Sequence, residues 1–319
     1  MTNQGIGIFI FSMTKAAFLF ISSVLMLLPF ILNAGEVDMR MQMLICLPLL
    51  LLLGIPHGAI DHVLYLRKNK NKNTQFVIVY LVIVGLNILL WLVLPSIAYL
   101  VFLLISAYHF GQSQFSHYLQ NQAISHKAVY LFWGLALLSG FIYFNLAEIQ
   151  VLTKNLDEFA AFAPLHQRTL ILGIFLSTGV VTLLLLVYLV QQNILRLEQV
   201  FMEVFEMALI LICFYLMPLL IGFTLYFIIL HALKVLREEY EFLRAEKEVH
   251  SFLNFMQLLS PFTLVSIAGI AMLFALIYLN ILKLSYGYLL LMVISSITLP
   301  HVFVMNSFYN LLSLKNHPK

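Results

Sequence analysis

The chain contains ten runs of about 18 or more mostly apolar residues, each long enough to cross the hydrocarbon core of a bilayer as a helix. Because lipid offers the backbone no hydrogen-bond partners, such runs must satisfy their own N–H and C=O groups as helices. The sequence therefore predicts an all-α, polytopic transmembrane helical bundle, with residues 1–319 forming a single integral membrane domain. The predicted spans cover residues 16–33, 42–66, 76–94, 96–115, 128–147, 169–190, 201–217, 219–236, 262–283 and 285–308.

The composition excludes several classes of protein. Hydrophobic residues make up 62% of the chain and charged residues only 10%, whereas about a quarter of a typical soluble domain is charged. The net charge of +3 is too small to indicate binding to nucleic acid. The two cysteines, Cys46 and Cys213, each lie inside an apolar run, so we expect small core residues and no disulfide framework.

The distribution of lysine and arginine predicts the orientation in the membrane. With a cytoplasmic N-terminus, 13 of the 17 basic residues fall on the cytoplasmic side, as the positive-inside rule requires. These are Lys15, Arg67, Lys68, Lys70, Lys72, Lys127, Arg196, Lys234, Arg237, Arg244, Lys247, Lys315 and Lys319; the other side has Arg40, Lys154, Arg168 and Lys283. We therefore expect both termini in the cytoplasm and a location in the cell (inner) membrane. As an alternative, residues 1–35 resemble a cleavable signal, with Lys15 before an apolar stretch that ends at Asn33-Ala34-Gly35.

Half of the ten histidines fall within apolar runs, where ionisable residues are costly and mark functional sites by default. These five are His57, His62, His109, His231 and His301. The remaining five fall in predicted loops or the C-terminal tail, where we expect solvated side chains. They are His117, His126, His166, His250 and His317.

Four of the intramembrane histidines occupy one predicted depth. His57, His109, His231 and His301 belong to the second, fourth, eighth and tenth spans, which all run towards the cytoplasm. Each lies about 5–9 residues before the cytoplasmic end of its span, so at a rise of 1.5 Å per residue their depths agree within about 6 Å. Convergence on one metal ion is the favoured interpretation, with hydrogen bonding between helices and proton relay as alternatives.

A cluster of imidazoles suits a transition metal, because neutral imidazole binds Fe, Zn, Cu and Ni. Four neutral ligands leave the charge of the ion uncompensated, which favours a partly open site able to bind a further ligand such as dioxygen. Asp61 follows His57 by four residues, on the same helical face, and is a candidate acceptor for the second nitrogen of a metal-bound histidine. His62 lies on another face, and we expect it outside the ligand set or as a substitute within it.

Proline and glycine flank the histidines. In Gly54-Ile55-Pro56-His57-Gly58, Pro56 removes the hydrogen bond to the Leu52 carbonyl and predicts a kink, while Gly58 permits close approach of a neighbour. Glycine also follows the second histidine in Tyr108-His109-Phe110-Gly111-Gln112, and proline precedes the fourth in Leu299-Pro300-His301.

Four segments resemble the Brp/Blh family of bacterial and archaeal membrane proteins, the β-carotene 15,15′-dioxygenases. They are Pro56-His57-Gly58-Ala59-Ile60-Asp61-His62, Tyr108-His109-Phe110-Gly111, His231 in an aromatic-rich helix, and Pro300-His301. The resemblance covers most of the chain. It implies a polytopic enzyme with a histidine-bound iron that uses O₂ to cleave the central double bond of β-carotene into two molecules of retinal.

What the resemblance implies for the site can be stated residue by residue. His57, His109, His231 and His301 would be the catalytic metal ligands, with Asp61 and His62 around them. The implied cofactor is Fe(II), and the implied partners are a lipid-soluble carotenoid, O₂ and membrane lipid, with no nucleic acid.

The chain departs from the family pattern at two positions. Val235 stands four residues after His231, where the family has the second histidine of a His-x-x-x-His pair, and valine cannot bind a metal. Either His301 or His62 completes the set, or the site has three ligands, or the activity is lost or changed. Gln114 stands near a position where family members tend to have an acid.

Two other functions fit parts of the pattern. A proton-coupled transporter or binding protein for an apolar molecule would also use broken helices and histidines near the membrane centre, but the sequence shows no inverted repeat and few intramembrane acids. A di-iron desaturase would need clustered histidine boxes, which are missing from this sequence. For a carotenoid, we expect an apolar tunnel that opens sideways to the bilayer, lined by some of the 27 Phe, 15 Tyr and 2 Trp residues.

Overall fold

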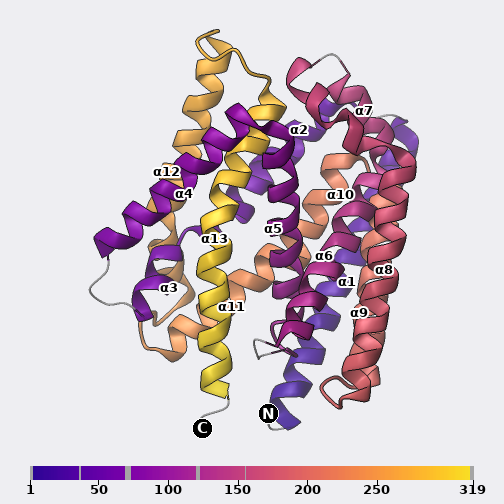
Figure 1. Cartoon of the computed structure of the whole chain (residues 1–319). Coiled ribbons are helices and arrows are strands. Elements are labelled where there is room, and N and C mark those ends of the chain that lie inside the picture. Colours follow the sequence, from indigo (N-terminus) through magenta and orange to yellow (C-terminus); the bar gives the residue numbers. More distant parts are fainter. Residues whose placement is uncertain (1–2, 36, 69–72, 120–122, 155, 317–319) are drawn as a thin grey trace.

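The computed structural model describes residues 3–35, 37–68, 73–119, 123–154 and 156–316 of the chain. Within these ranges every regular element is a helix, so the predicted all-α class is confirmed (Figure 1). The elements in chain order are α1 (Asn3–Ala34), α2 (Met39–Leu49), η1 (Leu50–Gly54), η2 (Ile55–Gly58), α3 (Asp61–Lys68), α4 (Asn73–Val93), α5 (Pro95–Phe115), α6 (Ile124–Phe144), α7 (Leu146–Thr153), η3 (Asp157–His166), α8 (Arg168–Gln191), α9 (Leu197–Leu216), α10 (Leu219–Leu225), η4 (Tyr226–Ala232), α11 (Leu233–Ala245), α12 (Phe252–Tyr278) and α13 (Tyr286–Asn316). Of the η elements, η1 and η4 are π-helical, and η2 and η3 are 3₁₀-helical.

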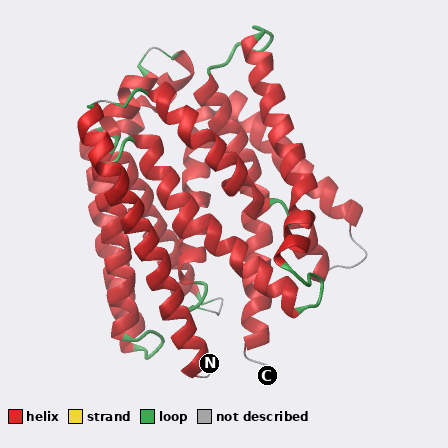
Figure 2. Cartoon of the chain, turned by 180° about the vertical axis from the view of Figure 1, so that it is seen from behind, coloured by secondary structure: helices red, strands yellow, loops and turns green. Residues whose placement is uncertain are grey.

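Ten helical stretches in the described part of the chain are long and apolar enough to cross a membrane, as predicted. The protein is thus a multi-pass membrane protein. Seen from either side, the long helices run side by side as one bundle (Figure 2). The start of α1 and the end of α13 lie at the same end of this bundle, as an even number of spans requires (Figure 1).

Several predicted span boundaries are wrong. The fifth span begins at Ile124 and ends at Phe144, several residues before the predicted range 128–147. The eighth span continues as α11 to Ala245, because the polar side chains of α11 find partners inside the protein and do not end the helix. The ninth span begins at Phe252, well before residue 262, and includes Pro261 within its helix.

Two short helices, α7 and η3, connect α6 to α8 and were not predicted. Phe159 and Phe162 of η3 pack with Trp91 and Tyr288 in an aromatic cluster between α4 and α13. At the end of η3, His166 is buried, and its Nε2 lies 3.0 Å from the hydroxyl of Tyr99. Burial lowers the pKa of His166, and the expectation that this side chain is solvated is wrong.

Two more of the five loop histidines differ from the prediction. His126 is buried at the start of α6, and Nε2 of His117 lies 2.7 Å from the carboxylate of Glu238. His250 is exposed, as expected. His317 and three of the lysines used for the orientation, Lys70, Lys72 and Lys319, lie outside the described residues.

Small residues let α5 and α6 approach until their backbones touch. A Cβ atom added at Gly111 would lie 1.9 Å from the carbonyl oxygen of Tyr130, and one added at Gly134 would lie 1.8 Å from that of Ala107. Association of membrane helices depends on such close packing, because no hydrophobic driving force acts between helices in lipid. The contact fixes the position of α5, which carries His109.

Hydrogen bonds attach α13 to α4. The Asn87 amide donates to the hydroxyls of Ser295 and Ser296, and the Trp91 indole donates to Ser295 at 2.6 Å. The hydroxyl of Tyr288 in turn donates to the carbonyl of Trp91 at 2.7 Å. These buried contacts fix α13, which carries His301.

Candidate metal centre

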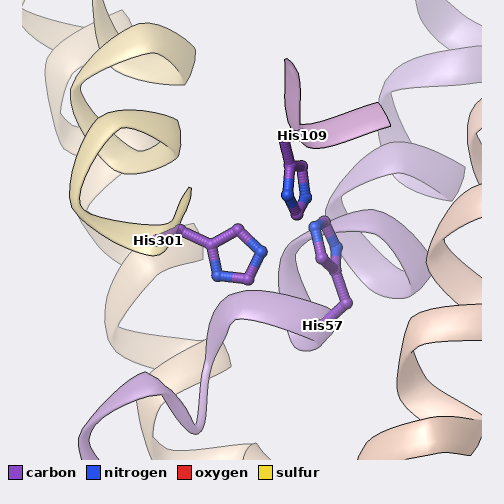
Figure 3. A group of neighbouring side chains, drawn as sticks. All are labelled: His57, His109 and His301. Atoms are coloured by element: carbon purple, nitrogen blue, oxygen red, sulfur yellow. The ribbon is translucent and has the colours of Figure 1, made fainter. Parts of the chain in front are cut away.

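The structure brings four histidines from four different elements together. They are His57 of η2, His109 of α5, His231 of η4 and His301 of α13. The ring centroids form a closed circuit, with 5.0 Å between His57 and His301, 5.0 Å between His301 and His109, 5.0 Å between His109 and His231, and 5.4 Å between His231 and His57. The rings of His57, His109 and His301 point toward one another from three sides (Figure 3).

The ring nitrogens lie close enough to share an ion. His57, His109 and His301 each offer a nitrogen, and these three atoms all lie within 4.8 Å of one another. Two donors about 2 Å from one ion lie at most about 4 Å apart, so small ring rotations complete the approach. His231 is not one of these three, but its ring lies against those of His57 and His109, and its buried Nε2 has no hydrogen-bond partner among the described residues.

Burial leaves these nitrogens without protein partners. His109, His231 and His301 are 3%, 2% and 3% exposed. Both ring nitrogens of His109, and Nε2 of His231 and of His301, have no hydrogen-bond partner among the described residues. A buried polar group left unsatisfied costs about 1–3 kcal/mol. A metal ion would supply the missing partner for one nitrogen of each of these rings, so the donor set fits a transition metal.

His57 lies where the second span breaks. In η1 the N–H of Ile55 bonds to the carbonyl of Leu50, one residue further back than in an α-helix. Pro56 then has no N–H to donate, and the chain tightens into the 3₁₀ turn η2. Nδ1 of His57 contacts the Gly54 carbonyl, which leaves Nε2 available for an ion.

Two glycines permit the packing around this break. A Cβ atom added at Gly54 would lie 2.9 Å from the Phe227 ring of η4, and one added at Gly58 would lie 3.4 Å from Nδ1 of His301. The first glycine therefore lets η1 approach η4, and the second leaves room for the His301 ring.

His231 also lies in an irregular helix. The π-helical segment η4 runs from Tyr226 to Ala232, between the α-helical segments α10 and α11. π-helical turns are rare and occur often at functional sites. The sequence of this span contains no signal for such a turn, because apart from His231 the residues of η4 are ordinary apolar and aromatic residues.

Asp61 lies against His301, and not against His57 as its position in the sequence suggested. Its Oδ1 is 2.8 Å from Nδ1 of His301, and both side chains are buried. Residues 59 and 60 form a turn between η2 and α3, so the regular helical spacing between His57 and Asp61 does not apply. Metal-bound histidines usually donate their second N–H to such a carboxylate, which fixes the ring and leaves Nε2 for the ion.

Two positions considered for the ligand set lie outside the cluster. The ring of His62 packs on Phe262 of α12 with 4.1 Å between centroids. Val235 is fully buried in an apolar cluster with Ile60 and Met305. The cluster of four therefore contains His301, and neither His62 nor position 235.

The profile of the family described as Beta-carotene 15,15′-dioxygenase matches residues 48–309. The chain belongs to this family. Among curated proteins and solved structures, no match was found.

The match to the β-carotene 15,15′-dioxygenase family confirms the resemblance seen in the sequence. It spans eight of the ten predicted membrane segments entirely and contains all four clustered histidines as well as Asp61. The family thus accounts for the part of the chain that builds the centre.

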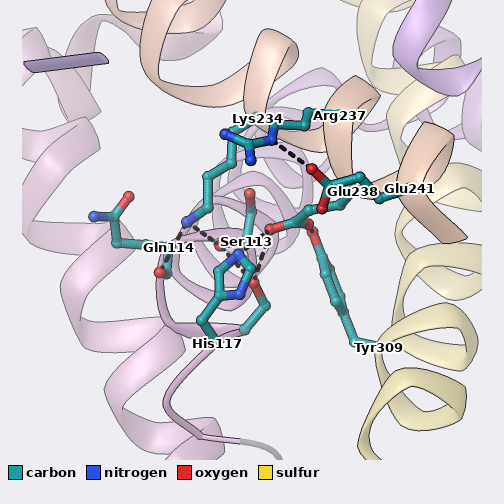
Figure 4. A network of polar contacts seen from close by, with 9 residues as sticks. Ser113, Gln114, His117, Lys234, Arg237, Glu238, Glu241 and Tyr309 are labelled. Carbon is teal, nitrogen blue, oxygen red and sulfur yellow. Dashed lines mark hydrogen bonds and ion pairs between the residues drawn. The ribbon is translucent and has the colours of Figure 1, made fainter. Parts of the chain in front are cut away.

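A second group of polar side chains lies beside the centre, and sequence reasoning missed it. Nζ of Lys234 donates to the carbonyls of Ser113 and Gln114, at 2.7 and 3.0 Å (Figure 4). Glu238 faces His117 and accepts from the Tyr309 hydroxyl at 3.1 Å. We call these residues the α5–α11 polar network: Ser113, Gln114, His117, Lys234, Glu238 and Tyr309. The only signal in the sequence is the spacing of four residues between Lys234 and Glu238, which puts them on one face of α11.

Gln114, the second departure from the family pattern, is part of this network. Its amide donates to the buried carboxylate of Glu203 in α9 at 2.8 Å. The amide therefore has a structural partner and lies outside the histidine cluster.

Proposed function

We propose that this protein is an iron-dependent dioxygenase that cleaves β-carotene at its central 15,15′ double bond and forms retinal within the membrane. The observation that carries the proposal is the circuit of four imidazoles with unpartnered nitrogens, found in a member of this family. His57, His109, His231 and His301 would bind the ferrous ion. In the reaction the C15=C15′ bond breaks, and each carbon receives one oxygen atom of O₂, so all atoms of both reactants appear in two molecules of retinal.

The residues of the chain hold and shield the centre. A ferrous ion bound there supplies the redox chemistry that activates dioxygen. Asp61 holds the His301 ring through Nδ1 and the Gly54 carbonyl holds that of His57, so each presents Nε2 to the same point. Four neutral imidazoles would leave the positive charge of a bound ion uncompensated, so such an ion could also bind a further ligand.

Aromatic side chains exclude water from one side of the centre. Phe110 lies 4.8 Å from the ring of His231, between centroids, and Phe227 lies 5.4 Å from His231 and 5.5 Å from His57. An apolar wall of this kind suits a polyene and prevents hydrolytic side reactions. An intramembrane site also spares the carotenoid the cost of leaving the lipid.

The orientation is part of the proposal. The start of α1 and the end of α13 lie at one end of the bundle (Figure 1), and 13 of the 17 basic residues fall on that side of the sequence-based topology. We therefore place both termini in the cytoplasm and the protein in the cell (inner) membrane.

Expression in a bacterium that accumulates β-carotene tests the proposed reaction. We expect the orange colour to fade and retinal to appear in extracts, with the His109→Ala variant as a matched control that keeps its colour. Persistent colour in cells that contain the iron-supplied, membrane-inserted protein would contradict cleavage of this substrate. A purified protein without iron that transports a solute in a pH-dependent way would support the transporter instead.

A further inference from the structure

An apolar groove opens on the lipid-facing side of the protein between the second and ninth spans. Its volume is about 410 Å³, and only apolar side chains line it. Leu44, Leu47, Leu51 and Leu52 form the wall on α2 and η1, and Ile267 of α12 lies opposite. We call this feature the α2–α12 groove.

The two helices that form the groove also meet the segment that carries His57. Its wall on the second span ends at Leu52, five residues before His57, and α12 also packs against η2, which carries His57. His57 is only partly buried, whereas His109, His231 and His301 are almost fully buried. Among the four histidines, His57 is therefore the one that is least buried and the one that follows the groove along the chain.

The dimensions match half of a carotenoid. β-Carotene is a rigid rod about as long as the hydrocarbon core is thick, about 30 Å. At a rise of about 1.5 Å per residue, the wall from Leu52 to Met43 lies about 7–21 Å from His57 along the span. The end of a rod centred on the histidines lies about 15 Å away, near Leu47, which is inside the groove.

We propose that the α2–α12 groove binds one end ring of the carotenoid and thereby sets which double bond lies at the histidines. This inference rests on the proposed function. The wall offers no hydrogen-bond partner, so an unsubstituted ring is favoured over a hydroxylated one, whose hydroxyl group would be buried unsatisfied. With one end ring held at a fixed distance from His57, cleavage falls at the centre of the polyene and gives retinal alone.

Tryptophan substitutions that fill the groove test the proposal. The variants are Leu47→Trp and Leu51→Trp on one wall and Ile267→Trp on the other, each assayed with β-carotene in lipid nanodiscs. Leu184→Trp is the matched control, because Leu184 is 64% exposed on α8, a different helix, and lies outside the groove. Iron content and membrane insertion are measured for all four variants.

We expect the groove variants to raise KM for β-carotene at least tenfold with normal iron content, and to yield unequal apocarotenals beside retinal. The control should behave as the wild-type protein. Groove variants that match the control in KM and in products would overturn the proposal and assign the groove to membrane lipid only.

A binding measurement separates this proposal from the proposed function. In a β-carotene-accumulating strain, the carotenoid that copurifies with the His109→Ala protein is compared with that of the double variants His109→Ala/Leu51→Trp and His109→Ala/Leu184→Trp. We expect loss of bound carotenoid in the first double variant alone, whether or not the wild-type protein cleaves it. Equal carotenoid in both double variants contradicts the groove as the binding site, while failure of the wild-type protein to form retinal contradicts the proposed reaction.

Discussion

The histidine centre and the α5–α11 polar network share helical segments, but they differ in whether their buried polar groups have hydrogen-bond partners. α5 carries His109 and then Ser113 and Gln114, the eighth span carries His231 and then Lys234 and Glu238, and α13 carries His301 and then Tyr309. In the network each of these side chains or carbonyls has a protein partner (Figure 4). In the centre, buried nitrogens of three histidines have none.

The difference separates a structural role from a binding role. Hydrogen bonds between buried groups stabilise the packing of membrane helices, by about 1 kcal/mol each. Buried nitrogens without partners cost free energy, and a bound metal ion would offset that cost at the centre. The irregular segments η1, η2 and η4 also belong to the centre, while the network lies on regular α-helices except for His117, which follows the end of α5. This difference supports the proposed metal binding at the centre and indicates a helix-packing role for the network.

Removal of any one of the four histidines should have the largest effect. His57→Ala, His109→Ala, His231→Ala and His301→Ala each delete a donor, so we expect losses in iron affinity and activity above the 10- to 100-fold typical of changes to groups around the ligands. Iron per purified chain and retinal formation provide the measurements. His62→Ala is the matched control, because its ring packs on Phe262 outside the cluster. If one of these four variants keeps both its iron content and its turnover, the substituted histidine is not a metal ligand.

Asp61→Asn should have an intermediate effect. The amide keeps the size of the side chain but removes the negative charge next to Nδ1 of His301. We expect iron affinity to fall about 10- to 100-fold, as for other partners of metal-bound histidines, measured by competition with a chelator. If Asp61→Asn binds iron as tightly as the wild-type protein, the contact with His301 does not support the metal.

Tyr309→Phe should have the smallest effect, and on a different property. It removes one hydrogen bond to Glu238, so we expect about 0.5–1.5 kcal/mol less stability and unchanged iron content. Unfolding in mixed micelles measures the loss of stability. Loss of iron in this variant, at unchanged stability, would contradict a packing role for the network that is separate from metal binding.

The sequence predicted the ten spans and the convergence of four histidines at one depth, because both predictions depend on local properties of the chain. Long apolar runs identify membrane helices directly, and the rise per residue converts the positions of His57, His109, His231 and His301 into a common depth. Which residue would partner Asp61 was not predictable, since the turn at residues 59–60 redirects it towards His301, which is 240 positions away. The extension of α11 to Ala245 was missed for a similar reason, because the partners of Lys234 and Glu238 lie on α5 and α13.

The burial of His126 and His166 also could not be predicted from the sequence. Both fall outside the long apolar runs, in segments that read as solvated loops. His166 is buried because η3 packs its aromatic side chains onto α4 and α13. The residues next to His166 in the sequence do not indicate this packing.

X-ray absorption at the iron edge of the purified, iron-loaded protein tests the central claim most directly. We expect about one iron per chain, with a first shell of nitrogen and oxygen donors at about 2 Å and the multiple-scattering pattern of several imidazoles. The number of imidazoles should fall by one in each of the four histidine variants. A protein that binds no iron, or whose iron spectrum is unchanged by these substitutions, would contradict the shared metal centre.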